Sequence, residues 1–266
     1  MISITTEQLN GWLAVLIWPL VRILAILAST PLLGSSSIPT PVKLGLALLL
    51  AILIAPLLPP LPQIDPGSGI GLIVLMQQVI IGLAMGFSMR IIFTAIEMAG
   101  EITGLQMGLG FAMFFDPQQS GQVQVIGRFY GLLATLFFLA IDGHLQVITI
   151  LAESFTTLPV GTDGINTASF TALVDRGVMI FTLGLHLALP VLTALLITNL
   201  ALGILTRAAP QLNIFAVGFP LTLGIGLLVM SWVLPYCTPL FSQIFRESFS
   251  FMQSLAGGAV HWTGIP

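Results

Sequence analysis

Four charged residues with helix-compatible spacing are the first candidates for chemistry in this sequence. Glu97 and Glu101 are at i and i+4, and Arg90 is at i−7 from Glu97, so a helix would place all three on one stripe. Two carboxylates alone on one face would repel each other, and Arg128 in the next apolar segment is an available partner. One interpretation is a buried ion network that braces the chain between these segments. The other is a set of ordinary flanking charges on the cytoplasmic side.

Neither catalysis nor metal binding is expected from the polar residues. General acid–base catalysis needs a substrate pocket, and nothing near the two carboxylates supplies a nucleophile. The pair Asp142 and His144 favours a turn at a span end over a metal site, because His186 and His261 have no ligand-like spacing to it. Cys237 lies in an apolar stretch and is expected to be a buried hydrophobe. We therefore expect no catalytic residue, no metal and no cofactor.

A glycine-rich segment with large apolar side chains is the strongest candidate for a moving part. Methionine is deformable enough to seal an irregular surface, and glycine lets the backbone swing. Such a segment could close a conduit through dry contacts and open without breaking strong bonds; an ordinary packed core loop is the alternative. We call it the candidate gate segment, and its residues of interest are Gly108, Gly110, Phe111, Met113, Phe114 and Phe115.

The composition places these residues in a membrane protein. Apolar residues make up 56% of the 266 and charged residues only 6%, whereas soluble domains carry about 25% charged residues. The net charge of −3 offers no basic surface for nucleic acid. The fold class expected is an all-α, polytopic membrane protein in contact with lipid.

The gaps between charges predict about six membrane helices of roughly 20 residues each. Proline and glycine clusters separate them and cannot continue a helix. The expected spans are Trp12–Thr30, Leu44–Leu61, Ile70–Arg90, Val123–Ile141, Val178–Thr206 and Ile214–Cys237. Basic residues near the span ends place the turn after Arg207 on the cytoplasmic side.

Three segments do not fit simple spans. Residues 97–124 are moderately apolar and rich in glycine, which predicts a helix extension followed by a loop held inside protein. Residues 239–256 mix apolar and polar side chains as an amphipathic helix on an interface or a partner does. Arg22 falls near the middle of the first span, so it either pairs inside a bundle or lies on a helix that does not face lipid.

The stretch 199–221 resembles the signature of the FliR/SpaR/EscT family of type III export membrane subunits. Its core, Arg207, Pro210, Gln211 and Asn213, is an unusual set between two spans. Weaker matches follow the family order at 34–47, 97–118 and 143–159, so the resemblance covers nearly the whole chain. The segment 216–220 looks more like the flagellar branch than the virulence-injectisome branch.

The resemblance implies a non-enzymatic subunit of a protein-export gate in the bacterial inner membrane, within the flagellar basal body. Its partners would be FliP-type and FliQ-type subunits in a closed helical assembly, an FlhB-type subunit, and the exported flagellar proteins. The family's plug loop corresponds to about 106–122 here, and the Arg207–Asn213 turn would lie near the FlhB-type partner. Residues 1–266 would form a single gate domain, with a helical part at 1–160 and a C-terminal hairpin and tail at 171–256.

Other functions remain open from the residues alone. An injectisome export subunit is the nearest alternative. A small-solute secondary transporter belongs to a different class, but such proteins often show internal repeats and paired broken helices, and this sequence has no such symmetry. An intramembrane enzyme would need a paired Ser–Lys, His–Glu or metal motif, which the sequence lacks.

Overall fold

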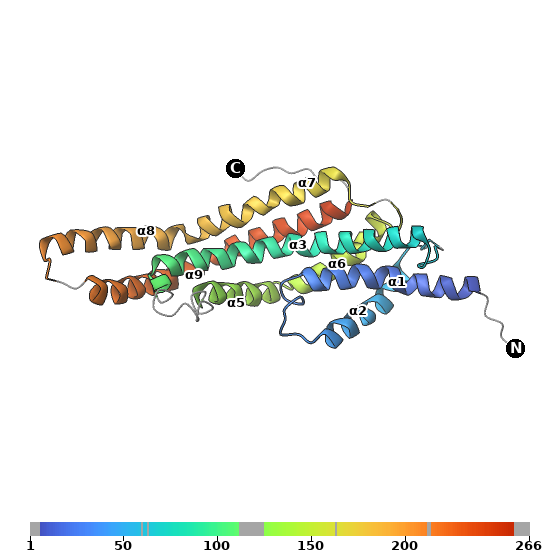
Figure 1. The fold of residues 1–266 in the computed structure, drawn as a ribbon, viewed down its shortest axis with the longest axis horizontal. Helices are drawn as coiled ribbons and strands as arrows, with labels where there is room; N and C mark the ends of the chain where they lie inside the picture. The colour runs from blue at the N-terminus through green and yellow to red at the C-terminus, as the bar shows by residue number, and fades with distance from the viewer. Residues whose placement is uncertain are drawn as a thin grey trace. The chain divides into compact units, whose positions relative to one another are not determined.

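The protein is all-helical throughout the residues that a computed structural model describes, which are 6–59, 61–62, 64–111, 125–162, 164–211 and 214–257. Figure 1 shows the chain as a series of helices, several of them long. Strands do not occur within these ranges. The predicted all-α class is thereby confirmed.

The helices are longer and more numerous than the predicted spans. In chain order they are α1 (Thr6–Ser29), α2 (Thr40–Ile54), the short η1 (Ala55–Leu57), α3 (Gly69–Gln106), η2 (Leu109–Phe111), α5 (Val125–Ala140), α6 (Gly143–Thr157), α7 (Thr167–Asp175), η4 (Arg176–Val178), α8 (Met179–Ala208) and α9 (Ile214–Gly257). The predicted extension beyond Arg90 is confirmed, because α3 continues to Gln106. Helices α6 and α7 were missed.

Four described helical segments are long and apolar enough to cross a membrane, or five if the broken pair α5 and α6 counts as one span. The expected number was about six. The first predicted span is not among these segments, because the part of α1 whose side chains the structure describes, Leu16–Ser29, is a shorter apolar helix. Asp142 breaks the α5–α6 pair with a left-handed backbone at φ 55°.

The helix α9 runs without interruption through Pro220, Pro235 and Pro239. We had predicted a span ending at Cys237 and a separate amphipathic helix on an interface or a partner, and this separation is wrong. Prolines are tolerated in membrane helices when neighbouring groups satisfy the freed carbonyls. The end of α9 is instead packed in the protein's own core, where Ser248, Phe251, Met252 and Leu255 are buried.

The chain forms two compact units, each assembled from separated stretches of sequence. The first contains residues 1–91, 142–177 and 246–266, and the second contains 92–141 and 178–245. The helices α3 and α9 each contribute residues to both units.

In the first unit, the end of α9 packs against α3 and the short helix η4. The Ser248 hydroxyl donates to the Ser88 carbonyl at 3.3 Å. The Arg176 guanidinium donates to the Glu247 carbonyl at 3.1 Å and stacks 4.0 Å from the centre of the Phe251 ring. These contacts join three sequence-distant stretches into one unit.

In the second unit, phenylalanine rings fill the space between α3, α5 and α9. Phe93 packs edge-on against Phe138 and Phe245 with ring centres 5.6 and 5.4 Å apart. Phe137 contacts Phe241 and Phe245 at 5.7 and 6.1 Å. Aromatic pairs at these separations contribute beyond their buried area, so this cluster is the core of the second unit.

Candidate functional site

The chain on both sides of the candidate gate segment is anchored within the second unit. At the entry, Met107 is fully buried, and its carbonyl accepts a hydrogen bond from the Thr222 hydroxyl of α9 at 3.0 Å. A Cβ on Gly226 would lie 2.5 Å from the Met107 side chain, so the two helices meet closely there and the methionine would have to move. Gly108 then turns the chain with φ 91°, a left-handed conformation that side chains rarely adopt.

The next described element after this segment, α5, contacts α3 through glycines. A Cβ on Gly100 would lie 2.6 Å from the Ile126 carbonyl oxygen and 2.8 Å from the Gly127 Cα, so the backbones of α3 and α5 touch there. Such small-residue crossings are typical of membrane helices that approach closely. Gly100 and Gly104, like Gly127 and Gly131, have the Gly-x-x-x-Gly spacing. This spacing was the signal that our sequence reasoning missed.

Of the predicted gate residues, the structure places Gly108 and Gly110 and the backbone of Phe111, which ends the short helix η2. Met113, Phe114 and Phe115 lie outside the described residues. The sealing role of the segment therefore stays a prediction. What the structure adds is that the entry and the exit of this segment have fixed positions in one compact unit.

The charged residues of the predicted ion network are exposed in the single chain. Glu97 and Glu101 of α3 extend over α5, where a Cβ on Gly131 would meet the Glu97 carboxylate at 2.7 Å and one on Gly127 would meet the Glu101 side chain at 2.8 Å. The structure thus brings both carboxylates to the α3–α5 crossing. Arg128 lies on α5 in the same unit, and Arg90 lies on the part of α3 in the other unit.

All four side chains are exposed in the single chain, and the buried ion network stays a prediction beside the alternative of flanking charges. Glycines at the crossing bring the two backbones together and leave the longer charged side chains at its rim. Charged residues on membrane helices normally face protein or water rather than lipid, so this rim is poorly suited to contact with lipid tails.

A second polar centre, in the first unit, surrounds Arg22 of α1. Its side chain is 0% exposed. Nε donates to Gln78 Oε1 of α3 at 2.9 Å, Nη1 donates to the Ser154 carbonyl and hydroxyl of α6 at 2.9 and 3.0 Å, and Nη2 donates to the Leu158 carbonyl at 2.9 Å. The guanidinium also lies 4.2 Å from the centre of the Phe155 ring.

These acceptors are all neutral, and two of them are backbone carbonyls at the C-terminal end of α6. The negative end of a helix dipole stabilises a cation there. Of the two interpretations of Arg22, pairing inside a bundle is therefore confirmed. Sequence reasoning identified Arg22 but not its partners, because Gln78 and Ser154 are ordinary helix residues at large sequence separation.

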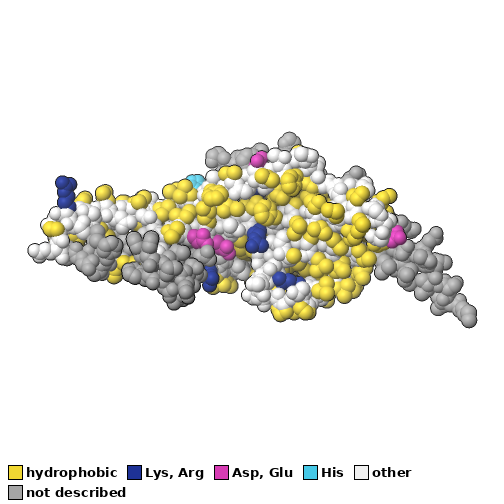
Figure 2. Space-filling view, in the orientation of Figure 1, with side chains coloured by type: hydrophobic (Ala, Val, Ile, Leu, Met, Phe, Trp, Pro, Cys, Tyr) yellow, Lys and Arg dark blue, Asp and Glu magenta, His cyan; other side chains and the backbone are white. Residues whose placement is uncertain are grey.

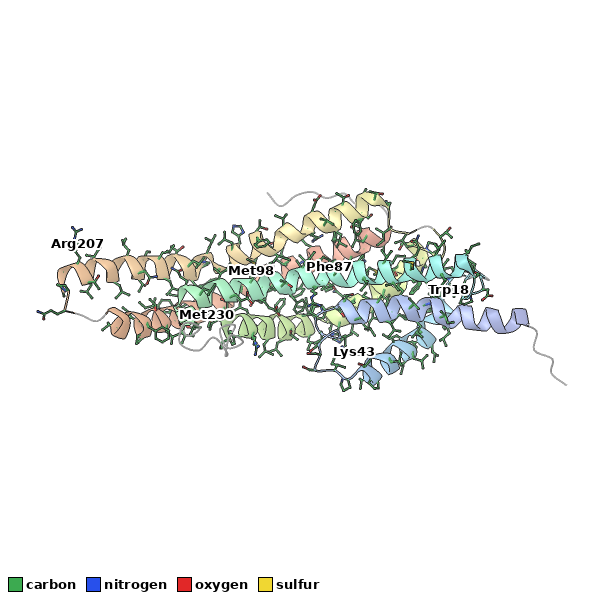
Figure 3. The ribbon with its side chains drawn as sticks, viewed as in Figure 1. Trp18, Lys43, Phe87, Met98, Arg207 and Met230 are labelled. Carbon is green, nitrogen blue, oxygen red and sulfur yellow. The ribbon has the colours of Figure 1, made fainter. Side chains whose placement is uncertain are left out.

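The turn after α8 is exposed at Arg207, Pro210 and Gln211. Figure 3 shows Arg207 projecting outward at the end of α8, close to the connection to α9. The amide of Ala209 caps the helix by donating to the Leu205 carbonyl at 2.8 Å. Asn213 lies outside the described residues. Arg207, Pro210 and Gln211 of this turn are therefore accessible from outside the chain.

The described residues contain no group of three or more His, Cys, Asp or Glu side chains that could hold a metal ion. The Nδ1 atom of His144 is buried without a hydrogen-bond partner in the structure. Figure 2 shows broad apolar surface with few charged side chains. Apolar surface of this kind is suited to contact with lipid or with protein.

Comparisons with known proteins agree with this geometry. Residues 13–248 match the family described as bacterial export proteins, family 1. The chain is similar to the flagellar biosynthetic protein FliR of Escherichia coli (strain K12), with 44% identity over 96% of this chain and 97% of that protein. It is also similar to the proteins of that name from Aquifex aeolicus, at 32% identity over 94% and 96% of the two chains, and from Bacillus subtilis, at 26% over 88% and 92%.

Proposed function

Because the chain belongs to family 1 of the bacterial export proteins, the family of the flagellar biosynthetic protein FliR, we infer that it is a subunit of the flagellar type III export gate. It is a non-enzymatic, multi-pass protein of the bacterial inner membrane. The observation that carries this conclusion is the similarity to FliR over nearly the full length of both chains.

We propose that FliP-type, FliQ-type and FlhB-type subunits cover much of the surface exposed in the single chain. Helices α3, α8 and α9 have 38, 30 and 44 residues, which is about 57, 45 and 66 Å of helix. A bilayer core is only about 30 Å thick. Exposed apolar side chains occur from Ile70 to Leu105 along α3 and from Phe181 to Leu205 along α8. Both stretches are longer than lipid tails can cover.

We further propose that the candidate gate segment plugs the conduit for exported flagellar proteins. Its two anchored ends support this role, because a plug must yield in the middle while its attachment stays in place. The charged rim of Glu97, Glu101 and Arg128, and the exposed turn of Arg207, Pro210, Gln211 and Asn213, would contact neighbouring subunits. Residues 1–266 would work as one domain, since α3 and α9 extend through both compact units.

Co-expression with FliP-type and FliQ-type proteins, gentle purification and native mass spectrometry test the assembly. We expect a discrete hetero-oligomer that contains this chain. A chain recovered only as a monomer or homo-oligomer in the presence of both partners would contradict the proposal and favour the solute-transporter alternative. Restored swimming of a strain that lacks its own FliR tests the flagellar role separately.

Replacement of Met113, Phe114 and Phe115 together by serine should make the assembled gate leak ions, because polar side chains cannot keep a dry seal. The measurement is the membrane potential of cells that express the complex, followed with a potential-sensitive dye. The matched control replaces the same three residues with leucine, which retains apolar bulk and should keep the membrane sealed. Equal potentials in the serine and leucine variants would refute the sealing role.

A further inference from the structure

Two buried side chains beside Arg22 carry N–H groups that have no acceptor in the described part of the protein. The Trp18 indole and the Gln78 amide are both 0% exposed. Trp18 Nε1 and Gln78 Nε2 nevertheless have no hydrogen-bond partner among the described residues. Buried donors are almost always paired, because an unpaired one loses its hydration and gains nothing in return. Two such donors close together therefore point to an acceptor that the chain itself does not supply.

Both groups lie next to the Arg22 guanidinium. Gln78 Oε1 accepts from Arg22 Nε at 2.9 Å, and the unpartnered Nε2 belongs to the same amide. Trp18 and Arg22 are four residues apart on α1 and so share a face of that helix. Figure 3 shows Trp18 on the stretch of α1 that runs along α3. The two helices meet closely there, since a Cβ on Gly82 of α3 would lie 2.5 Å from the Arg22 carbonyl oxygen.

The positive charge of Arg22 adds a further requirement. Its described hydrogen bonds number four, whereas a guanidinium has five N–H groups, and all four acceptors are neutral. No carboxylate accepts from Arg22 among the described residues. Buried charges are normally paired with an opposite charge. One further N–H group of a cation thus lies beside the two unpartnered donors.

An anion satisfies these groups better than a water molecule does. Water must donate two hydrogen bonds as well as accept, and the acceptors around Arg22 are already engaged. Gln78 Oε1 and the Leu158 carbonyl accept from the guanidinium, and the Ser154 carbonyl accepts from it and from the Leu158 amide. An anion only accepts, and it supplies the missing negative charge. Because Trp18, Arg22 and Gln78 are all 0% exposed, a small ion suits the place and the carboxylate of another chain does not.

We propose that Trp18 Nε1, Gln78 Nε2 and the remaining Arg22 N–H bind one monovalent anion of the size of chloride. The ion neutralises the guanidinium and links α1 to α3 through hydrogen bonds to a charge, which are stronger than neutral ones. The stability of the first unit therefore depends on chloride. Binding is independent of the export role, because all three ligands belong to the first unit of this chain.

Thermal unfolding in chloride and in gluconate at equal ionic strength tests the site. The full-length chain is purified in detergent, alone or with the subunits that accompany it, and chloride then replaces gluconate, which is too large to be enclosed. A ligand that binds only the folded state stabilises it by mass action. Once the site is mostly filled, each ten-fold increase in chloride should raise the melting temperature by roughly 3–5 °C. A melting temperature that ignores chloride would overturn the proposal.

Trp18→Phe removes the indole N–H and keeps an aromatic ring. It should raise the chloride concentration needed for half of the stabilisation by roughly ten-fold or more, because a hydrogen bond to an ion is lost. Trp232→Phe is the matched control, since Trp232 is 68% exposed and its loss should leave the chloride dependence unchanged. If Trp18→Phe lowered the melting temperature equally in chloride and gluconate, the indole would serve packing or bind water, and the anion would be ruled out.

Gln78→Glu replaces the amide with a carboxylate of nearly the same shape. The new charge pairs with Arg22 directly and repels an anion, so chloride should no longer affect the melting temperature. Gln146→Glu adds the same charge at an exposed position of α6 in the same unit, and this control should respond to chloride as the unaltered protein does. A Gln78→Glu protein that keeps the full response would contradict the assigned ligands.

Direct binding to the unaltered protein does not depend on the folding of any variant. Radioactive chloride, followed by scintillation proximity on the immobilised protein, should bind saturably and be displaced by bromide but not by gluconate. The same measurement on Trp18→Phe should require roughly ten-fold more chloride or greater for half saturation. Absence of saturable binding to the unaltered protein, or equal binding to both proteins, would refute the site.

Discussion

Arg22→Leu should lower the free energy of unfolding of the first unit by roughly 2–5 kcal/mol, although leucine suits a membrane helix better than arginine does. The loss leaves the Gln78 oxygen and the Leu158 carbonyl without the arginine donor, while the Ser154 carbonyl keeps the Leu158 amide, and each unsatisfied buried group costs roughly 1–3 kcal/mol. Thermal unfolding of the purified complex in detergent measures the effect. We expect a lower melting temperature and reduced swimming.

Arg90→Leu is the matched control for this substitution. Arg90 lies in the same unit but is exposed, so its replacement should change stability within about 0.5 kcal/mol. Arg22→Lys should fall between the two, because one ammonium group cannot supply the three directions of the guanidinium or stack on Phe155 in the same way. If the Arg22→Leu complex had the same melting temperature as the unaltered complex, these hydrogen bonds would not stabilise the unit.

Gly100→Ala should destabilise the second unit by about 1–3 kcal/mol, the usual effect of overpacking. The new Cβ would lie within 2.6–2.8 Å of backbone atoms of Ile126 and Gly127, and backbone cannot rotate away as a side chain can. The helices α3 and α5 must separate instead, which displaces the exit anchor of the candidate gate segment. Thermal unfolding and swimming should both be impaired.

Gly203→Ala provides the control, because a Cβ there would meet nothing within 4 Å. Alanine is favoured over glycine inside a helix by about 1 kcal/mol, so this variant should be unchanged or slightly more stable. Since both glycines lie in helices of the second unit, the comparison isolates the crossing. Similar effects of the two substitutions would show that the α3–α5 contact is not tight in solution.

The helical class and most span positions could be predicted because the length of an apolar stretch that crosses a bilayer is fixed by the bilayer thickness. The misses have identifiable causes. Helix α6 contains His144, Gln146, Glu153 and Ser154, so it resembles a polar connection until Arg22 and α9 supply its partners. The split of α9 at Pro239 applied a rule for water-soluble helices, whereas packing against neighbouring helices allows this helix to continue.

The candidate site was only partly readable from sequence. The charges at Glu97 and Glu101 and the glycines at 108 and 110 could be identified by residue type. The anchors could not, because Met107 meets Thr222 and Gly226 across more than a hundred residues. The exposure of the charged rim also followed from a geometric fact, the backbone contact at Gly100, which no single-helix pattern contains.

The first unit is made of three stretches of chain that the ribosome does not produce together. Residues 1–91 are finished long before residue 246, where the last stretch begins. At translation rates of about 5–20 residues per second, this interval lasts roughly 10–30 s. Until residue 154 is made, Arg22 has only Gln78 of its hydrogen-bond partners, and until the last stretch is made the contacts of Phe251 and Met252 with the first unit cannot form. The first unit can therefore complete its core only when the end of the chain has been synthesised.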